Sequence, residues 1–151
     1  MVKYVEKNVV FSEIPECVTL AVSISNCPFR CKGCHSDYLR NDIGKALTEE
    51  EISEMIDKCR GVNCFLFLGD GTDTDAICRY ARYIKAKYPN IKTAIYSGYD
   101  DVMDEYRTCF DYIKTGKYNA TLGALRSRTT NQKLYRNESS ELVEITSEFW
   151  K

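Results

Sequence analysis

Three cysteines stand close together in this chain, as Cys27, Cys31 and Cys34. Their spacing is C-x3-C-x2-C, and they follow an apolar, β-branched run directly. Thiolates are soft ligands that select zinc or iron–sulfur clusters. At these separations a loop can turn all three toward one centre, and Gly33 permits a tight turn between them. The spacing therefore predicts a metal or cluster site at Cys27, Cys31 and Cys34.

The number of thiolates helps to separate the two kinds of site. A structural zinc usually takes four ligands, often as two separated pairs, whereas this chain offers one compact triplet. His35 is an unfavourable fourth ligand, because adjacent side chains rarely reach the same metal. A [4Fe–4S] cluster held by three cysteines keeps one iron without a protein ligand, and that iron can bind a substrate. The triplet favours a [4Fe–4S] cluster, with zinc as the alternative.

The chain has eight cysteines, so five lie outside the triplet. They are scattered over segments predicted to be strands or helices. A free cysteine is often a small buried hydrophobe, and we expect these five to pack in the core. They are Cys17, Cys59, Cys64, Cys78 and Cys109.

Length and composition predict one domain over residues 1–151. At 17.4 kDa the chain is too short for a complete eight-unit α/β barrel, which takes about 250 residues. With 44% hydrophobic and 28% charged residues it is not a disordered sequence. It shows neither an apolar run long enough to span a bilayer nor a signal-peptide core, which predicts a cytoplasmic protein that does not bind membranes. The net charge of −1 argues against nucleic acid binding.

Predicted strands alternate with predicted helices. Thr48 followed by three glutamates is typical of a helix start, and the helix is expected to end near Arg60. Alternation of this kind predicts a parallel sheet with right-handed crossovers. Since the length excludes a closed barrel, the expected fold is α/β, an open partial (β/α) barrel. The predicted strands cover 17–24, 64–68, 91–96 and 110–114, the helices 49–60, 74–88 and 100–108, with further strands expected at 2–11 and 142–146.

Small or polar residues follow each of the four central strands. Gly69-Asp70-Gly71 follows the second, Ser97-Gly98 the third, and Lys114-Thr115-Gly116 closes the fourth. In parallel α/β proteins the carboxyl ends of the strands carry the ligand site. The cysteine motif itself follows the first strand, so we expect one site at this edge.

A C-x3-C-x2-C motif after the first strand of an alternating α/β chain resembles the radical S-adenosylmethionine (SAM) enzymes. A narrower resemblance is to activating proteins of the anaerobic (class III) ribonucleotide reductase. It spans most of the chain, and it is carried by residues 27–35, 67–73, 96–98, 110–116 and 129–136.

This resemblance implies a [4Fe–4S] cluster whose open iron is chelated by the amino and carboxylate groups of SAM. One electron then splits SAM into methionine and a 5′-deoxyadenosyl radical, which removes a hydrogen atom from a backbone glycine of the reductase. The cofactors supply the chemistry, and the protein supplies orientation and exclusion of water. The implied partners are the glycyl-radical subunit of the anaerobic ribonucleotide reductase and a low-potential electron donor such as a flavodoxin.

Carried over residue by residue, the resemblance makes Cys27, Cys31 and Cys34 the cluster ligands. Relatives carry Gly-Gly-Asp or Gly-Gly-Glu where this chain has Gly-Asp-Gly-Thr-Asp, so either Asp70 or Asp73 could supply the carboxylate. Lys114 shares the edge and is equally a solvated lysine or a SAM contact. The residues implied to contact SAM are Gly33, Cys34, His35, Gly69, Asp70, Gly71 and Ser97.

Two other functions stay open at this point. An activase of another glycyl-radical enzyme, such as pyruvate formate-lyase, would keep the cluster and SAM but change the target. A zinc-stabilised binding module would need neither. Residues 112–137 contain no acidic residue but six basic ones. That tract is either a solvated face or a surface for the reductase or the electron donor.

Overall fold

The computed structural model describes residues 2–29, 37–139 and 141–150. Its helices are α1 (Glu49–Lys58), α2 (Thr74–Lys87) and the short α3 (Asp104–Arg107), with 3-10 helices η1 (Asp37–Arg40) and η2 (Thr146–Trp150). Its strands are β1 (Lys3–Val10), β2 (Thr19–Ile24), β3 (Lys45–Ala46), β4 (Cys64–Leu68), β5 (Lys92–Tyr96), β6 (Tyr112–Thr115), β7 (Lys133–Glu138) and β8 (Glu141–Glu144). No helix in these ranges is long and apolar enough to cross a bilayer.

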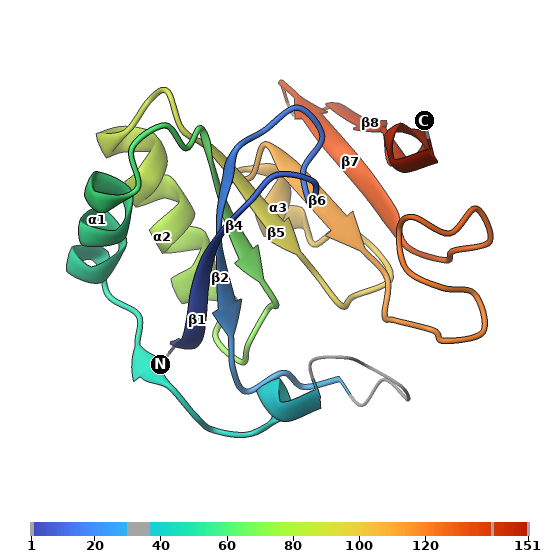
Figure 1. Cartoon of the computed structure of the whole chain (residues 1–151), viewed down its shortest axis with the longest axis horizontal. Helices are drawn as coiled ribbons and strands as arrows, with labels where there is room; N and C mark the ends of the chain where they lie inside the picture. The colour runs from blue at the N-terminus through green and yellow to red at the C-terminus, as the bar shows by residue number, and fades with distance from the viewer. Residues whose placement is uncertain (1, 30–36, 140, 151) are drawn as a thin grey trace.

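The described strands form one mixed sheet in the order β3-β1-β2-β4-β5-β6-β7-β8 (Figure 1). The four central strands, β2, β4, β5 and β6, are parallel, as the alternation predicted. β1 and β3 extend the sheet antiparallel at one edge, and β7 and β8 extend it antiparallel at the other. The carboxyl ends of the four parallel strands therefore meet at one edge. That the sheet is a partial barrel of the radical SAM type stays a prediction.

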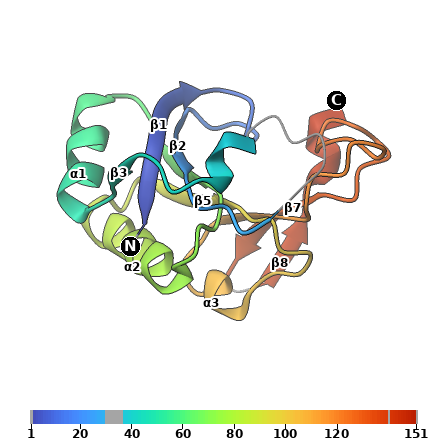
Figure 2. The same ribbon diagram turned by 90° about the horizontal axis from the view of Figure 1, so that it is seen from below.

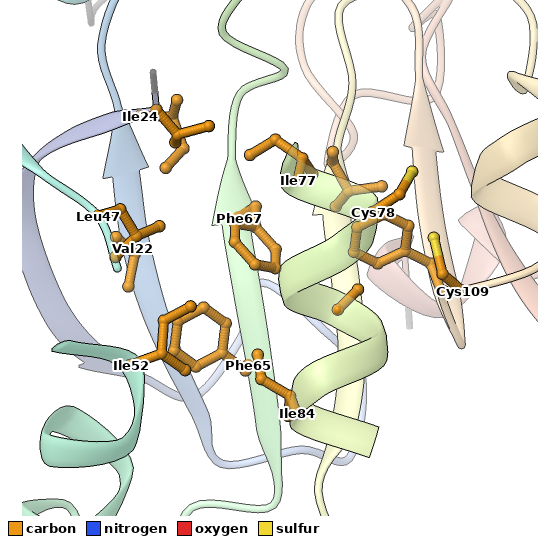
Figure 3. Close-up of a cluster of buried hydrophobic side chains, with 14 of the residues drawn as sticks. Val22, Ile24, Leu47, Ile52, Phe65, Phe67, Ile77, Cys78, Ile84 and Cys109 are labelled. Atoms are coloured by element: carbon orange, nitrogen blue, oxygen red, sulfur yellow. The ribbon is translucent and has the colours of Figure 1, made fainter. Parts of the chain in front are cut away.

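The two faces of the sheet are covered differently. α1 and α2 pack on one face, where Phe67, Ile77 and Ile52 belong to one fully buried cluster (Figure 3). On the other face the loop between β1 and β2 and the C-terminal segment form a second cluster, which includes Ile14 and Leu134. Seen from below, α1 and α2 lie on one side of the molecule and the C-terminal part lies on the other (Figure 2). Each large side chain removed from water contributes roughly 1.5–3 kcal/mol.

The central strands are apolar because both of their faces are covered. β4, with the sequence CFLFL, is buried over its first four residues, and all six residues of β2 are buried. Continuous apolar runs of this kind are typical of parallel strands. The predicted helix at 100–108 is shorter, since α3 covers only Asp104–Arg107. β7, with the sequence KLYRNE, was not predicted. Apart from one buried leucine its residues are exposed or half-buried, so it lacks the continuous apolar run of the central strands.

Thr48 caps α1 as predicted, and this gives a first testable expectation. Its side chain accepts a hydrogen bond from the backbone N–H of Glu51 at 3.1 Å. Thr48→Ala should lower the free energy of unfolding by about 1 kcal/mol. Thr48→Ser keeps the oxygen and should unfold near the denaturant concentration of the unchanged chain. Equal midpoints for the alanine and serine variants in urea would show that the cap does not stabilise α1.

Candidate functional site

The segment that leads into the cysteine motif is held by backbone hydrogen bonds. The N–H of Cys27 donates to the carbonyl of Leu39 at 2.8 Å, and that of Asn26 donates to the carbonyl of Asn41 at 3.2 Å. Asn26 has a φ of 60°, a left-handed conformation that asparagine tolerates better than most residues. Cys27 is half-buried, with its Sγ atom 3.9 Å from the carbonyl oxygen of Phe29. The first cysteine of the motif therefore has a defined position.

The other residues predicted at the motif, Cys31, Gly33, Cys34 and His35, lie outside the described residues. Among the described residues no three cysteine, histidine or acidic side chains gather as a metal site. The donor set that fits a cluster is therefore the sequence triplet, of which the structure places Cys27. A soft thiolate there, at the end of a buried parallel strand, suits a [4Fe–4S] cluster.

A cavity of about 450 Å³ lies at the carboxyl edge of the parallel strands. The strand ends contribute Cys27, Gly69, Asp70, Gly98 and Lys114 to its lining. The sequence predicted this edge as the ligand site, and the structure brings residues from all four strand ends to one cavity. Pockets of about 300–1,000 Å³ are typical of small-molecule and cofactor sites. The cavity is therefore large enough for a cofactor beside Cys27.

Of the two candidate carboxylates, Asp70 lines the cavity and Asp73 is not among its described lining residues. Asp70 is buried and accepts two hydrogen bonds, one from the N–H of Gly98 at 2.8 Å and one from the hydroxyl of Tyr106 at 2.7 Å. Burial, and next the Asp70 charge, raise the pKa of Tyr106. Asp73 caps α2 by accepting from the N–H of Ala76 at 3.1 Å. Asp70 therefore shapes the cavity wall, and Asp73 starts a helix.

Gly69 and Gly71 turn the chain at the end of β4. Their φ angles are 122° and 61°, a region that other L-residues rarely adopt. A Cβ on Gly71 would also lie 3.1 Å from the side chain of Ile24. The two glycines let the backbone fold closely against the end of β2. Gly69 lines the cavity, whereas Gly71 is not among the described lining residues.

Lys114 places a buried ammonium group at the same edge. Its Nζ atom donates to the carbonyl of Ser97 at 2.9 Å and to that of Gly116 at 3.1 Å, and it lies 5.5 Å from the centre of the Tyr96 ring. Carbonyl acceptors and an aromatic face offset the cost of burying the charge. Ser97 is buried, and its hydroxyl accepts from the N–H of Tyr99 at 3.1 Å. The Ser97 side chain therefore holds the turn and is not among the described lining residues.

Phe29 packs directly on Gly98. A Cβ built on Gly98 would lie 2.4 Å from two ring atoms of Phe29, a distance that forces a displacement. The Tyr99 ring meets the Phe29 ring edge-on with centroids 5.1 Å apart, and the Nζ atom of Lys117 lies 5.3 Å from the Phe29 centroid. The glycine is required here because an aromatic ring of the cysteine segment occupies the place of a side chain.

Several cavity residues were not singled out from the sequence. Glu13 comes from the loop between β1 and β2, and Phe149 comes from the C-terminal segment. Tyr96 ends β5, and its hydroxyl donates to the carbonyl of Glu13; burial, and next the Glu13 charge, raise its pKa. Strand alternation could have placed Tyr96 on the cavity face. Nothing in the sequence indicates which loops cover that face.

The cysteines outside the motif are separated from the cavity. Four of them, Cys17, Cys64, Cys78 and Cys109, are buried, and Cys59 is half-buried. A hydrogen bond between Cys64 and Cys17 lowers the pKa of Cys17 to about 7 and raises that of Cys64. Cys78 and Cys109 lie beside each other on the helical face (Figure 3). None of the five is among the described lining residues.

Fold and site together define an α/β protein that carries a cysteine motif and a ligand cavity at the carboxyl edge of its parallel strands. Residues 16–137 match the model of a protein family described as a 4Fe-4S single cluster domain. The chain therefore belongs to this family, and it is an iron–sulfur protein with a [4Fe–4S] cluster as its cofactor. Comparison with curated proteins and with solved structures found no match.

Proposed function

We propose that this iron–sulfur protein is a radical SAM activase that generates the glycyl radical of an anaerobic ribonucleotide reductase. Cys27, Cys31 and Cys34 would hold the cluster, and the cavity at the strand ends would hold SAM. When bound, the cluster supplies the electron that splits SAM, and the resulting 5′-deoxyadenosyl radical takes a hydrogen atom from a glycine of the reductase.

The cavity beside Cys27 carries this proposal. A cluster that only passes electrons between partners does not need a ligand cavity next to it. Here about 450 Å³ lies at the edge where Cys27 enters the motif. A cavity of this size fits an organic cofactor, and three cysteines leave one iron available to it. An iron–sulfur site joined to a cofactor pocket favours SAM chemistry over simple electron transfer.

The strand ends offer the cofactor backbone groups as well as polar side chains. Both oxygens of Asp70 accept hydrogen bonds from within the chain, and Nζ of Lys114 donates to two carbonyls. Gly69 lines the cavity and has no side chain, so its peptide groups can approach a ligand closely. Fixed peptide dipoles in a site that excludes water orient a ligand without reorganising. In this proposal peptide groups at the strand ends contribute to SAM binding beside the side chains that line the cavity.

The basic tract is the proposed contact for the macromolecular partners. Lys117 and Arg126 line the cavity, so the positive charge reaches its rim. Other members have partners within the chain: Arg136 pairs with Glu138 at 2.6 Å, and Arg128 donates to the carbonyl of Trp150 at 3.3 Å. We propose that the rim around Lys117 and Arg126 meets the reductase, or a flavodoxin-like electron donor with an acidic surface.

Anaerobic turnover tests the function directly. Reconstituted protein, a low-potential reductant and SAM should yield methionine and 5′-deoxyadenosine. Addition of a class III ribonucleotide reductase should then give a glycyl radical signal by electron paramagnetic resonance (EPR), and a reductase with alanine at the target glycine should give none. SAM cleavage with a radical only on a pyruvate formate-lyase-like enzyme would reassign the target. A colourless protein that takes up zinc and no iron would establish the binding-module alternative.

A further inference from the structure

A buried tyrosine–aspartate pair connects α3 with the cavity wall. Tyr106, on α3, is fully buried, and its hydroxyl donates to Oδ2 of Asp70 at 2.7 Å. Asp70 itself is 1% exposed. Tyr106 is not among the described residues that line the cavity. Its hydroxyl is connected to the cavity wall by the hydrogen bond to Asp70.

The second oxygen of Asp70 continues this connection. Its Oδ1 accepts from the backbone N–H of Gly98 at 2.8 Å and so fixes the turn after β5. The ring of Phe29 lies on Gly98, in the space that a Cβ would fill. Phe29 is two residues beyond Cys27 in the same segment, so its position constrains the backbone that carries the Cys27 side chain. A continuous set of contacts therefore runs from Tyr106 to Phe29, in the segment that carries the first cysteine.

We propose that Tyr106 and Asp70 are positioning residues for the cluster. They hold the Gly98 turn, Gly98 seats the Phe29 ring, and Phe29 holds the backbone segment that carries the Cys27 thiolate. The backbone bonds of Cys27 and Asn26 fix the segment from the side of η1, and the Phe29 contact fixes it from the side of β5. Residues beyond the metal ligands that orient them commonly tune metal affinity and potential.

This inference rests on cluster binding at Cys27, which is the first element of the proposed function, and not on SAM or on a reductase. Its test therefore uses cluster properties alone. If the chain holds a cluster but does not cleave SAM, the proposed activity fails while the positioning role can still be measured. If no cluster forms in the unchanged chain, both fail.

The experiment compares Tyr106→Phe with Tyr83→Phe in anaerobically reconstituted protein. Tyr83 is half-buried and its hydroxyl lies 2.5 Å from Oγ of Ser53, away from the cavity, so the control also removes a tyrosine hydroxyl that has a partner. Tyr106→Phe should shift the midpoint potential and the EPR g-values of the reduced cluster. It should also release iron to a chelator about fivefold faster or more, the factor expected for one lost buried hydrogen bond. Tyr83→Phe should match the unchanged chain in all three measurements.

Phe29→Ala tests whether the effect of Tyr106 on the cluster passes through the contact between Gly98 and Phe29. If the Phe29 ring transmits the effect, Phe29→Ala should shift the potential and g-values too, and adding Tyr106→Phe should change them no further. Should Tyr106→Phe not fold, Asp70→Asn takes its place, since it keeps the shape of the side chain and an acceptor for Gly98. A folded Tyr106→Phe protein with unchanged g-values, potential and iron release would overturn the proposal. So would additive effects of the two changes.

Discussion

Cys27→Ala is expected to reduce the iron bound after anaerobic reconstitution to background and, under the proposed function, to abolish SAM cleavage. The motif offers only three thiolates, so a [4Fe–4S] cluster held by them already has one iron without a protein ligand. Two remaining cysteines cannot hold the other three irons. Removing one ligand from a metal site usually costs far more than the 0.5–3 kcal/mol of an ordinary substitution. Iron analysis and visible absorbance measure the loss, and Cys31→Ala should behave in the same way.

The matched control is Cys59→Ala. Cys59 is half-buried at the C-terminal end of α1 and is not among the described residues lining the cavity. This variant removes a thiol but no predicted ligand, so it should keep the full iron content and the full rate of SAM cleavage. Full iron in Cys27→Ala would refute the ligand assignment. Lost iron in Cys59→Ala would show that the cluster uses a cysteine outside the motif.

Gly98→Ala is expected to give the second largest effect, a weakened cluster in a protein that still folds. The new methyl group would lie 2.4 Å from the Phe29 ring, so the ring must move. Overpacking of this kind typically costs about 1–3 kcal/mol. Because the ring belongs to the segment that carries Cys27, the cost should appear as poorer iron loading and, under the proposed function, a lower affinity for SAM. At about 1.4 kcal/mol per factor of ten, this range corresponds to a loss of affinity of about 5- to 150-fold, with about 30-fold as the central expectation.

Gly61→Ala separates this effect from a general loss of stability. Gly61 has a φ of 92°, and a Cβ there would meet no atom within 4 Å. Alanine at this position strains the backbone by about 1–2 kcal/mol without touching the site. The variant should unfold at a lower denaturant concentration and load iron normally. If Gly98→Ala binds iron and SAM like the unchanged chain, the contact between Phe29 and Gly98 does not matter for the site.

The sequence predicted those parts of the fold in which local patterns and burial agree. The run CFLFL of β4 is apolar because both of its faces are covered, and Thr48 caps α1 because its oxygen reaches an N–H three residues on. β7 and the C-terminal segment were missed or only weakly indicated. Their conformation depends on packing against the sheet, as the burial of Leu134 among residues from distant segments shows.

The sequence indicated which edge of the sheet carries the site, but not which residues contact one another there. Strand ends with small and polar residues indicated where the cavity lies. The hydrogen bond between Asp70 and Tyr106 joins residues that are 36 positions apart. The contact between Phe29 and Gly98 likewise depends on the distance between two strand ends. Such long-range pairs leave no periodic signal in one sequence.

The burial of Cys17, Cys64, Cys78 and Cys109 also bears on how the holoprotein matures. An unfolded chain presents eight thiols to incoming metal, and many wrong combinations of them could capture iron. Folding withdraws these four into the interior and so removes most of the competition before metallation. We therefore expect assembly factors to act on the folded apoprotein, and iron supplied during refolding from denaturant to give more mismetallated product than iron supplied afterwards.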